Sequence, residues 1–377
     1  MDCIFAVLSL TLPFSFTFIL NSIQHPRCAK RIDEFLSRGY TVAVYGFSRE
    51  NGLYIPKTYR MLGMLCNKSS YFSRFKLMYN AIRKVANQYD TRNTIFYYFG
   101  LDVAMAGRCA TSIPYIYEES DLAHTYIKRC LFRKTLEWID RFLIKRSEET
   151  IFTSEGFSLY HFNNNRPNNV TIIPNKLNEK CLYLKYRPIK NINLDCLNIG
   201  FVGGVRFYSV LNLAKVFALN FPNCTFHFFG SRMPTTDKLW NKLFEECVGI
   251  PNVKYHGAFN NPEDLPGIYA QIDMVVATYD VTIENVRYAE PNKIYEAIFF
   301  ETPIIVSNGT FLSQKVNSLG IGFGINPLDE EEIVSFFKQL TKSSLIECSK
   351  KCALIDKREV INNNDAFFYK LKNKGIC

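Results

Sequence analysis

Short apolar segments alternate with amphipathic segments along most of the chain, and this alternation limits the fold more than any other feature of the sequence. It predicts an α/β protein whose parallel sheets are covered on both faces and bind ligands at the carboxyl ends of their strands. In the first half, strands are predicted at Phe16–Leu20, Thr41–Tyr45, Thr94–Tyr98, Pro114–Tyr117, Thr150–Thr153 and Val170–Ile173. In the second half, they are predicted at Leu197–Val202, Cys224–Phe229, Val253–His256, Asp273–Thr278 and Pro303–Val306, with helices around 210–219, 237–246, 262–270 and 291–300.

The two series of strands are separated by Asn175–Asn193, a polar segment without an apolar period. A chain of 377 residues is long enough for about two domains. We therefore predict a first domain over residues 1–174, a linker over residues 175–193 and a second domain over residues 194–345. Residues 1–13 are interpreted as an apolar leader of a cytosolic protein, because the segment has no positively charged start and Pro13 interrupts it. A membrane-spanning helix is the alternative.

The segment Glu290–Ser307 predicts a helix followed by a buried strand. Helical spacing places Asn292, Lys293 and Glu296 on one side of that helix, and we expect these three side chains to point away from the packed side. A helix N-terminus with an adjacent lysine is a natural place for a phosphate, and a carboxylate one turn later could accept hydrogen bonds from a ribose. A solvated helix face is the alternative.

A second candidate segment, IGFVGGVRFYS, follows the first predicted strand of the second domain. Gly203 and Gly204 come directly after the strand, so the backbone could approach a ligand there, and Arg206 could bind an anion. Gly230 ends the next strand and is expected at the same edge of the sheet. A tight turn between a strand and a helix is the alternative.

The net charge of +10 belongs almost wholly to the first half of the chain: residues 1–180 contain 24 Lys and Arg against 15 Asp and Glu, and the remainder contains 21 against 20. Most of the excess lies in Lys57–Lys84 and Lys128–Arg146, where cations alternate with apolar residues at near-helical spacing. Basic amphipathic helices of this kind suit an anionic membrane surface, nucleic acid or water. Because no nucleic-acid motif is present, we predict the membrane surface as partner and no nucleic acid.

The twelve cysteines are scattered, without a Cys-X-X-Cys pair or a Cys/His cluster. This pattern predicts reduced thiols in a cytosolic protein and no structural zinc. We predict no cofactor. Because no convincing DxD sequence is present, cationic side chains and helix dipoles are expected to neutralise an anionic ligand without a divalent metal ion.

Four segments of the second half resemble the donor-binding domain of GT-B glycosyltransferases, in particular the family 4-like enzymes of bacterial surface and capsular polysaccharide synthesis: FVGGVR, FHFFGS, NVKYHGAFNNPEDLPGIYAQIDMVVATYD and EPNKIYEAIFFETPIIVS. Three segments of the first half resemble the acceptor-binding domain of that family in the same order: NSIQHPRCAKRIDEFLSRGYTVAVYGFSRE, PYIYEESDL and IFTSEGFSLYHF with TIIPNKL. The resemblance implies two Rossmann-like domains that face a cleft. It also implies that residues 346–377 pack back toward the first domain.

The resemblance also assigns residues of the donor site. Glu296 is similar to the second glutamate of the family's paired-glutamate motif, which holds the donor ribose. The first glutamate falls at Tyr288 in this chain, and Glu290 is the nearest carboxylate. Arg206 matches the arginine that binds the diphosphate. The lysine that usually follows it is missing from residues 207–214, so we expect Lys293 to take over part of its role.

In the first domain, six polar residues lie at predicted strand ends or in the turns that follow them. The segment with Glu118, Asp121 and His124 is similar to a family segment that often supplies acceptor or sugar contacts, and we take these three as catalytic candidates, with Glu119 beside them. His25 and Arg27 are candidates on the acceptor side. Helix caps and surface groups are the alternative for each of these residues.

The sequence thus predicts a cytoplasmic glycosyltransferase of the hexosyltransferase type, peripheral to the inner face of the cell membrane. It would move a sugar from a nucleotide-sugar donor to a lipid-linked or growing polysaccharide acceptor. The resemblance implies retention of stereochemistry. A nucleotide-sugar epimerase of the same fold and a non-catalytic scaffold derived from it are the alternatives.

Overall fold

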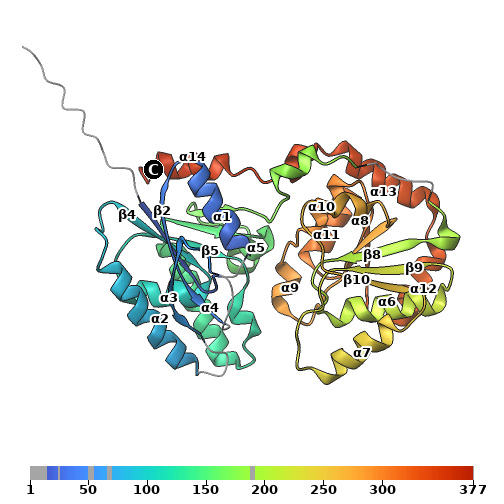
Figure 1. Cartoon of the computed structure of the whole chain (residues 1–377), viewed down its shortest axis with the longest axis horizontal. Helices are drawn as coiled ribbons and strands as arrows, with labels where there is room; N and C mark the ends of the chain where they lie inside the picture. The colour runs from blue at the N-terminus through green and yellow to red at the C-terminus, as the bar shows by residue number, and fades with distance from the viewer. Residues whose placement is uncertain (1–14, 24–25, 50–54, 66–69, 187–191, 377) are drawn as a thin grey trace, which may run out of the picture. The chain divides into compact units, whose positions relative to one another are not determined.

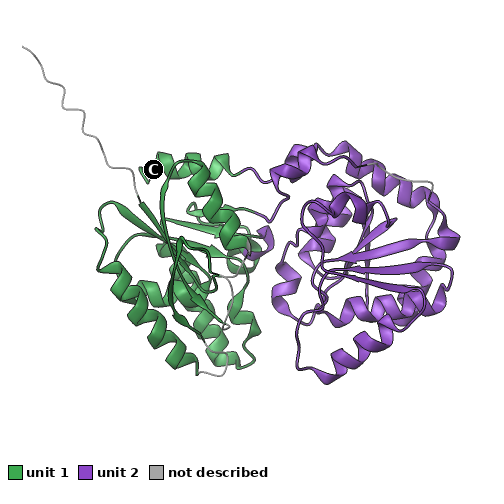
Figure 2. Cartoon of the chain, viewed as in Figure 1, with its two compact units in different colours: residues 1–153, 158–173, 364–377 green, residues 154–157, 174–363 purple. Residues whose placement is uncertain are grey.

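The structure is a computed structural model that describes residues 15–23, 26–49, 55–65, 70–186 and 192–376 (Figure 1). The chain forms two compact units (Figure 2). Unit 1 contains the described residues up to Thr153, then Ser158–Ile173 and the residues from Asn364 onward. Unit 2 contains Ser154–Phe157 and Pro174–Asn363.

Unit 1 is built on a seven-stranded parallel sheet with the order β3-β2-β1-β4-β5-β6-β7. Its strands are β1 Ser15–Leu20, β2 Thr41–Ser48, β3 Tyr59–Met64, β4 Thr94–Phe99, β5 Tyr115–Glu119, β6 Glu149–Phe152 and β7 Val170–Ile172. Its helices are α1 Pro26–Ser37, α2 Tyr71–Ala86, α3 Leu101–Ala110, η1 Ala123–Tyr126, α4 Cys130–Arg146, α5 Glu155–Phe162 and α14 Asp365–Asn373; the first residues of α5 belong to unit 2.

Unit 2 is built on a six-stranded parallel sheet with the order β10-β9-β8-β11-β12-β13. Its strands are β8 Asn198–Val202, β9 Thr225–Phe229, β10 Val253–Gly257, β11 Met274–Ala277, β12 Ile304–Ser307 and β13 Gly322–Ile325. Its helices are η2 Glu179–Tyr183, η3 Leu194–Cys196, α6 Tyr208–Asn220, α7 Lys238–Val248, α8 Leu265–Tyr269, α9 Glu284–Tyr288, α10 Lys293–Phe299, α11 Phe311–Leu319, α12 Glu330–Gln339, α13 Lys342–Leu354 and η4 Lys357–Val360.

Neighbouring residues of the unit 2 strands enter two different cores, because successive side chains of a strand point to opposite faces. Val276 of β11 packs in the core that contains Phe217 of α6 and Phe337 of α12. Its neighbour Val275 packs in the other core, with Ile298 of α10. Both faces of the sheet are therefore covered, as the continuous apolar strands predicted.

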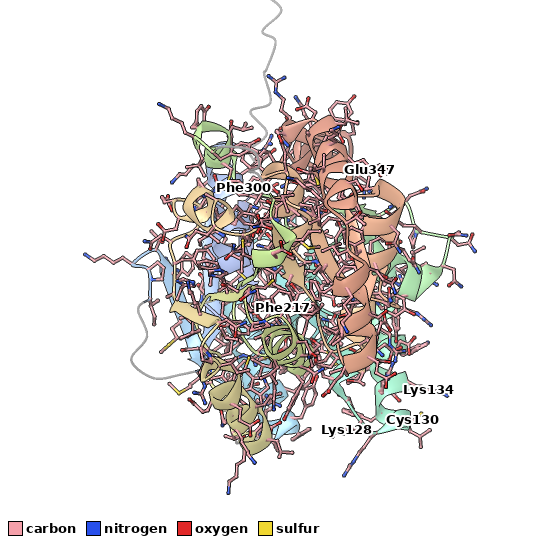
Figure 3. All side chains as sticks on the ribbon, turned by 90° about the vertical axis from the view of Figure 1, so that its right-hand side faces the viewer. Lys128, Cys130, Lys134, Phe217, Phe300 and Glu347 are labelled. Carbon is pink, nitrogen blue, oxygen red and sulfur yellow. The ribbon has the colours of Figure 1, made fainter. Side chains whose placement is uncertain are left out.

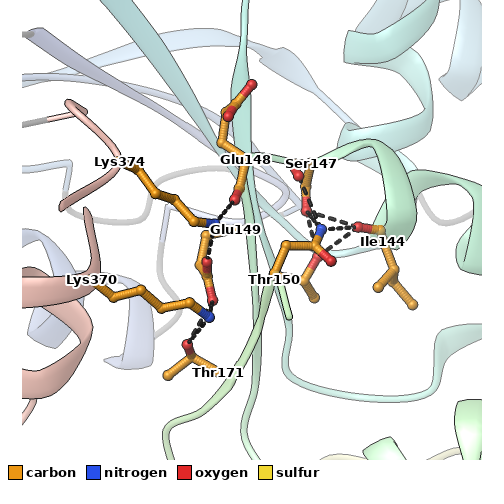
Figure 4. Close-up of polar contacts among 9 residues, drawn as sticks. Ile144, Ser147, Glu148, Glu149, Thr150, Thr171, Lys370 and Lys374 are labelled. Carbon is orange, nitrogen blue, oxygen red and sulfur yellow. Dashed lines mark hydrogen bonds and ion pairs between the residues drawn. The ribbon is translucent and has the colours of Figure 1, made fainter. Parts of the chain in front are cut away.

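The helix α14 returns the chain to unit 1 and is held there by a buried carboxylate. Glu149 of β6 is fully buried and accepts hydrogen bonds from Lys370 Nζ at 2.5 Å and from Lys374 Nζ at 2.6 Å (Figure 4). Phe367 and Phe368 of the same helix enter the core formed by β1, β4 and α1. Helix α14 is thus part of unit 1, together with the first strands of the chain.

Two domain boundaries and one predicted helix differ from the prediction. The predicted linker belongs to unit 2 in its described part, because Leu177 and Cys181 are buried in a unit 2 core. Residues 346–363 also belong to unit 2, so only the residues from Asn364 onward pack in unit 1. The segment Lys57–Lys84 is not one basic helix, since it contains strand β3 and most of helix α2.

Candidate functional site

Three glycines mark the carboxyl ends of adjacent strands in unit 2. The backbone N–H of Gly203 donates to Phe229 O, and that of Gly230 donates to Gly257 O, both at 2.7 Å. Gly203 and Gly230 have φ angles of 145° and 141°. A Cβ atom on Gly230 would lie 1.9 Å from Gly203 O, so only glycine fits there. The ends of β8, β9 and β10 therefore form a bare backbone edge that a ligand could approach closely.

Lys293 and Glu296 lie beside this edge as a buried ion pair. Lys293 Nζ donates to both oxygens of Glu296, at 2.7 and 2.9 Å. Glu296 is fully buried and also accepts from Asn292 Nδ2 and from the Tyr269 hydroxyl, each at 2.7 Å. Lys293 Cε lies 3.6 Å from the place of a Cβ atom on Gly203.

The predicted orientation of this helix was therefore wrong. Lys293 is 5% exposed, and Glu296 is not exposed at all. The helix α10 is buried on all sides, and its two charged side chains neutralise each other instead of facing solvent. All four lone pairs of the Glu296 carboxylate are matched by donors. A ribose hydroxyl could reach Glu296 only by displacing one of these donors.

Arg206 is the exposed cation of the predicted donor set. Its guanidinium lies 4.8 Å from the centre of the Phe207 ring. Burial and the charge of Glu296 raise the pKa of the Tyr279 hydroxyl, and the charge of Arg206 opposes that rise. The charges of Arg206 and Glu296 thus act on the same hydroxyl in opposite directions. Gly204 follows this edge, where a Cβ atom would lie 3.1 Å from Met233 Sδ.

The N-terminus of helix α6 is closed by the protein itself. Asp280 accepts from the backbone N–H groups of Tyr208 and Ser209, at 3.1 and 2.8 Å. Two of the free N–H groups expected at a helix start are therefore already bonded to a carboxylate. The charge of Asp280 would oppose an anionic ligand at the first turn of α6, whereas Arg206 would attract one.

Glu290 and Tyr288, the two positions considered for the first motif glutamate, both have structural contacts. Glu290 is buried and accepts from the Tyr295 hydroxyl and from Lys315 Nζ, the latter at 2.5 Å. The carbonyl oxygen of Tyr288 accepts from Ser154 Oγ at 2.5 Å. The described contacts of Glu290 therefore neutralise it within unit 2, as those of Glu296 do.

A hollow of about 380 Å³ lies at the carboxyl ends of β9 and β10. His256 is exposed, and its ring stacks on the buried ring of Phe229, with ring centres 4.2 Å apart and planes 7° apart. His227 Nδ1 lies 3.0 Å from His256 Nε2 and helps to hold that ring. The hollow also contains Gly257, so it adjoins the glycine edge and offers a flat aromatic wall.

In unit 1, the catalytic candidates do not form one group. Glu118 is buried against Arg31 Nε at 3.1 Å and the Tyr97 hydroxyl, so its contacts are those of a structural ion pair. Asp121 and His124 instead line a cavity of about 200 Å³. Asp102 and Arg49 line the same cavity, and burial raises the pKa of Asp102.

The two acceptor-side candidates have different outcomes. Arg27 Nη1 donates to Ser120 O at 3.2 Å, which places it beside the loop that follows β5. His25 lies outside the described residues. Arg27 therefore contacts the segment between β5 and η1, which contains Asp121 and leads into His124 of η1.

Sequence reasoning missed Asp140, Tyr160 and His161, which surround His124 and Glu119. Asp140 Oδ2 lies 3.2 Å from His124 Nδ1, and the Tyr160 hydroxyl lies 3.3 Å from His124 Nε2. His161 Nε2 lies 3.0 Å from Glu119 Oε2. A signal for Asp140 exists in the sequence, because it interrupts an apolar stripe of helix α4 formed by Leu136, Leu143 and Ile144.

The ligand atoms of Glu119, Asp140 and His161 lie within 4.8 Å of one another, and all three residues are buried. These residue types can hold a metal ion, and they can equally share protons. In the part of the chain that the structure describes, no helix is long and apolar enough to span a membrane.

No family model matches the sequence, and no curated protein matches it. Among solved structures, the chain is similar to sucrose-phosphate synthase from Thermosynechococcus elongatus, with a TM-score of 0.69 and 14% identity over 96% of this chain and 98% of that one. It is similar to Anabaena HepE in complex with UDP, with a TM-score of 0.69 and 14% identity over 96% of this chain and 100% of that one. It is also similar to WaaG, a glycosyltransferase involved in lipopolysaccharide biosynthesis, with a TM-score of 0.60 and 16% identity over 92% and 97% of the two chains. The predicted fold class is confirmed, and the chain has the GT-B fold.

Proposed function

We propose that this chain is a glycosyltransferase of the hexosyltransferase type, and that unit 2 binds its nucleotide-sugar donor. The observation that carries the proposal is the bare edge formed by Gly203, Gly230 and Gly257, with the exposed Arg206 at one side and the aromatic hollow at the other. A nucleotide sugar has a flat base, a diphosphate and a sugar. The base suits a stacking wall, the diphosphate suits a cation, and the sugar suits a backbone edge.

The comparisons support the same class of donor. HepE has been solved in complex with UDP-glucose, and its structure covers 96% of this chain. We therefore infer that the ring of His256 stacks against the nucleobase and that Arg206 binds the diphosphate. Lys293 contributes less than the sequence suggested, because the buried Glu296 already neutralises its charge.

Calorimetric titration of the full chain with UDP, GDP, ADP and UDP-glucose tests the donor site. We expect one of these nucleotides to bind with one ligand per chain, and product analysis with the corresponding nucleotide sugar to show transfer to an acceptor or slow hydrolysis. An epimerised nucleotide sugar as the product would show an epimerase instead. No binding of any nucleotide would show that the edge is not a donor site.

We further propose that transfer retains stereochemistry and needs no divalent metal ion. Cationic side chains can stabilise a departing diphosphate, which is the role that a metal has in other transferases. Turnover should then survive EDTA, and NMR of the product should show the anomeric configuration of the donor. Loss of turnover on chelation that manganese or magnesium restores would contradict the metal-free mechanism. An inverted product would contradict retention.

We propose an anionic membrane surface as the place where unit 1 meets a lipid-linked or polysaccharide acceptor. Helix α4 buries one stripe and exposes large apolar side chains on the rest: Leu131 is 83% exposed and Trp138 67%. Lys128 lies just before this helix and Lys134 in its first turns, and both side chains are exposed (Figure 3). Exposed Trp and Leu next to cations suit the interface between headgroups and acyl chains. This placement supports peripheral attachment at the cytoplasmic face.

Vesicle sedimentation separates the contributions of charge and of apolar burial to membrane binding. Replacing Lys128, Arg129 and Lys134 by Gln should weaken binding to anionic vesicles by about 1 kcal/mol per cation at low salt. Replacing Leu131 and Trp138 by Ser should weaken it at all salt concentrations, because apolar burial is not screened. A matched control removes three exposed lysines of unit 2, Lys238, Lys254 and Lys350. Equal losses in the control and the α4 variants, or no binding by the wild type, would contradict the proposal.

A further inference from the structure

Four adjacent strands of the unit 2 sheet each contribute one polar residue to a single chain of hydrogen bonds. The order of these strands in the sheet is β10-β9-β8-β11. The residues are His256 of β10, His227 of β9, Asn198 of β8 and Asp273, which directly precedes β11. His256 lines the hollow at the carboxyl ends of β9 and β10. The chain therefore runs from the amino end of β8 to the proposed donor site.

The first part of this chain is fixed by backbone contacts. Asp273 Oδ2 accepts from the backbone N–H of Asn198 at 2.8 Å, and the backbone N–H of Asp273 donates to Asn198 O at 2.7 Å. The Asn198 side chain donates from Nδ2 to Cys196 O at 3.2 Å, which leaves its Oδ1 3.1 Å from His227 Nε2. The opposite orientation of this amide would place two acceptors, Oδ1 and Cys196 O, against each other. Asn198 therefore presents an acceptor to His227.

An acceptor at Nε2 decides where His227 carries its proton. Nε2 of His227 must donate to Asn198, and burial disfavours a second proton on this ring, so its Nδ1 has a lone pair. His227 Nδ1 lies 3.0 Å from His256 Nε2, so the proton between the two rings belongs to His256. Partial burial, and then the charge of Lys254, lowers the pKa of His256. At neutral pH both rings are thus uncharged and have their protons on Nε2.

The same hydrogen bond holds the plane of the His256 ring. The ring centres of His227 and His256 are 5.3 Å apart, and their planes differ by 13°. With the two nitrogens 3.0 Å apart, the rings lie edge to edge in nearly one plane, and the bond lies in that plane. The terminal torsion of a histidine side chain has no sharp minimum of its own, so the ring could rotate without this bond. Since Phe229 stacks on one face of the His256 ring, the other face is left for a ligand.

The backbone of β10 is irregular at the same residue. The register between β10 and β9 pairs Tyr255 with Phe228 and then Gly257 with Phe229, so His256 is an extra residue in β10. A bulge of this kind bends the strand and changes the direction of a side chain, and bulges are common beside binding sites. The bulge and the hydrogen bonds therefore both determine where the His256 ring lies.

We propose that His227 is a positioning residue of the donor site, which holds the ring of His256 as a neutral wall for the nucleobase, and that Asn198 sets the tautomer on which this depends. This inference rests on the proposed function. A wall that already has its bound orientation needs no ordering of its side chain when the nucleotide arrives. His227 thus strengthens nucleotide binding through His256 and not by a contact of its own.

Nitrogen-15 NMR of the full chain tests the direction of the hydrogen bond. The chain has five histidines, and their signals can be assigned through the bonds that link each ring to its backbone amide. The shared proton should be bonded to His256 Nε2 and should show a coupling across the hydrogen bond to His227 Nδ1. A shared proton bonded to His227 Nδ1 would overturn the proposal. The result is read from the wild type, so it does not depend on the folding of a variant.

Two variants of His227 separate positioning from packing. His227→Phe keeps a flat ring of similar size but offers no acceptor to His256, whereas His227→Asn is smaller and places an amide oxygen near the position of Nδ1. Calorimetry uses whichever of UDP, GDP and ADP binds best to the wild type. Affinity should fall about fivefold or more in His227→Phe and less than about twofold in His227→Asn. If His227 only fills space, His227→Phe should bind better than His227→Asn, and this order would overturn the proposal.

A double-variant cycle and a second ligand are the controls. In a His256→Phe background no hydrogen bond to His227 can form, so His227→Phe should cause no further loss of nucleotide affinity. Inorganic pyrophosphate has the diphosphate without a base, and its affinity should not change in the two His227 variants. Equal losses for pyrophosphate and the nucleotide would show a general disturbance of unit 2 and would overturn the positioning role.

These measurements also separate this inference from the proposed function. If a nucleotide binds and both His227 variants bind it as well as the wild type does, only the role of His227 is wrong. If none of UDP, GDP and ADP binds to the wild type, the proposed function fails, and the role of His227 in a donor site fails with it.

Discussion

Each unit buries a carboxylate in its polar centre, but the two units neutralise it in different ways. In unit 2, Glu296 faces the fixed cation of Lys293 at 2.7 Å. In unit 1, Asp140 and Glu119 are just as buried, and their described partners are histidine and tyrosine side chains. A lysine ammonium keeps its charge across the neutral range, whereas a buried histidine such as His161 gains a proton as the pH falls. Unit 2 therefore has a polar centre that resists pH, and unit 1 has one that responds to it.

The largest expected effect comes from removing the fixed cation of unit 2. Lys293→Met leaves Glu296 buried without its ion pair, which should lower the free energy of unfolding of unit 2 by about 3–5 kcal/mol. Chemical denaturation followed by the fluorescence of Trp240, in a Trp138→Phe background, measures unit 2 alone. The double variant Lys293→Met/Glu296→Gln should recover part of the loss. A loss below about 1 kcal/mol would show that the hydrogen bonds from Asn292 and Tyr269 are enough to stabilise Glu296.

The corresponding test of unit 1 is a change of pH. The folded pKa of His161 is about 4 and its ordinary value is 6.5, so the unfolded chain binds a proton in this interval that folded His161 does not. Stability should therefore be lost as the pH falls from about 6.5 toward 4, by up to about 3 kcal/mol. Hydrogen exchange of the β5 amides should show this loss in the wild type and a smaller one in His161→Gln. Equal pH dependence in both proteins would exclude His161 as the cause.

A third test concerns Arg206, the exposed cation of the predicted donor set. Arg206→Ala should weaken nucleotide diphosphate binding by about 1–3 kcal/mol, as expected for lost charge-assisted hydrogen bonds. The free energy of unfolding should change by less than about 0.5 kcal/mol, because Arg206 is exposed. Arg358→Ala, also exposed in unit 2, is the matched control. Calorimetry in which both variants bind equally well would remove Arg206 from the donor site.

The smallest expected effect tests redundancy in unit 1. Glu149 has two lysine partners, each about one-third exposed, so Lys370→Met should cost only about 1 kcal/mol while Lys374 keeps the charge compensated. Exchange of the α14 amides measures this cost. A loss as large as that in Lys293→Met would show that the second lysine cannot compensate alone.

Much of the fold could be predicted because buried strands have continuous apolar sequences. The two strands that sequence reasoning missed, β3 and β13, are both edge strands. Strand β3 exposes Arg60, and β13 contains two glycines, so neither has a strong apolar run. Edge strands are less buried than central strands, so their sequences contain fewer continuous apolar residues and predict a strand less clearly.

The candidate site could be predicted only where one short segment carries it. Gly203 and Arg206 follow one strand, and the structure keeps them at its end. The burial of Lys293 and Glu296 could not be predicted, because helical periodicity treats charged residues as solvent-facing, and here the two charges compensate each other. Asp140 and His161 meet Glu119 only through the packing of α4 and α5 on β5, and no local spacing encodes that contact.

The return of α14 to unit 1 has a consequence for the order of folding during synthesis. The strands of unit 1 leave the ribosome first, but the helix that supplies Phe367 and Phe368 to their core begins at Asp365. All residues of unit 2 have been made by Asn363. Unit 2 can therefore complete its fold while unit 1 still waits, with an open apolar face, for its last piece. A nascent chain that stops at residue 363 would lack α14. Its unit 2 could fold, but its unit 1 would stay incomplete although it was made first.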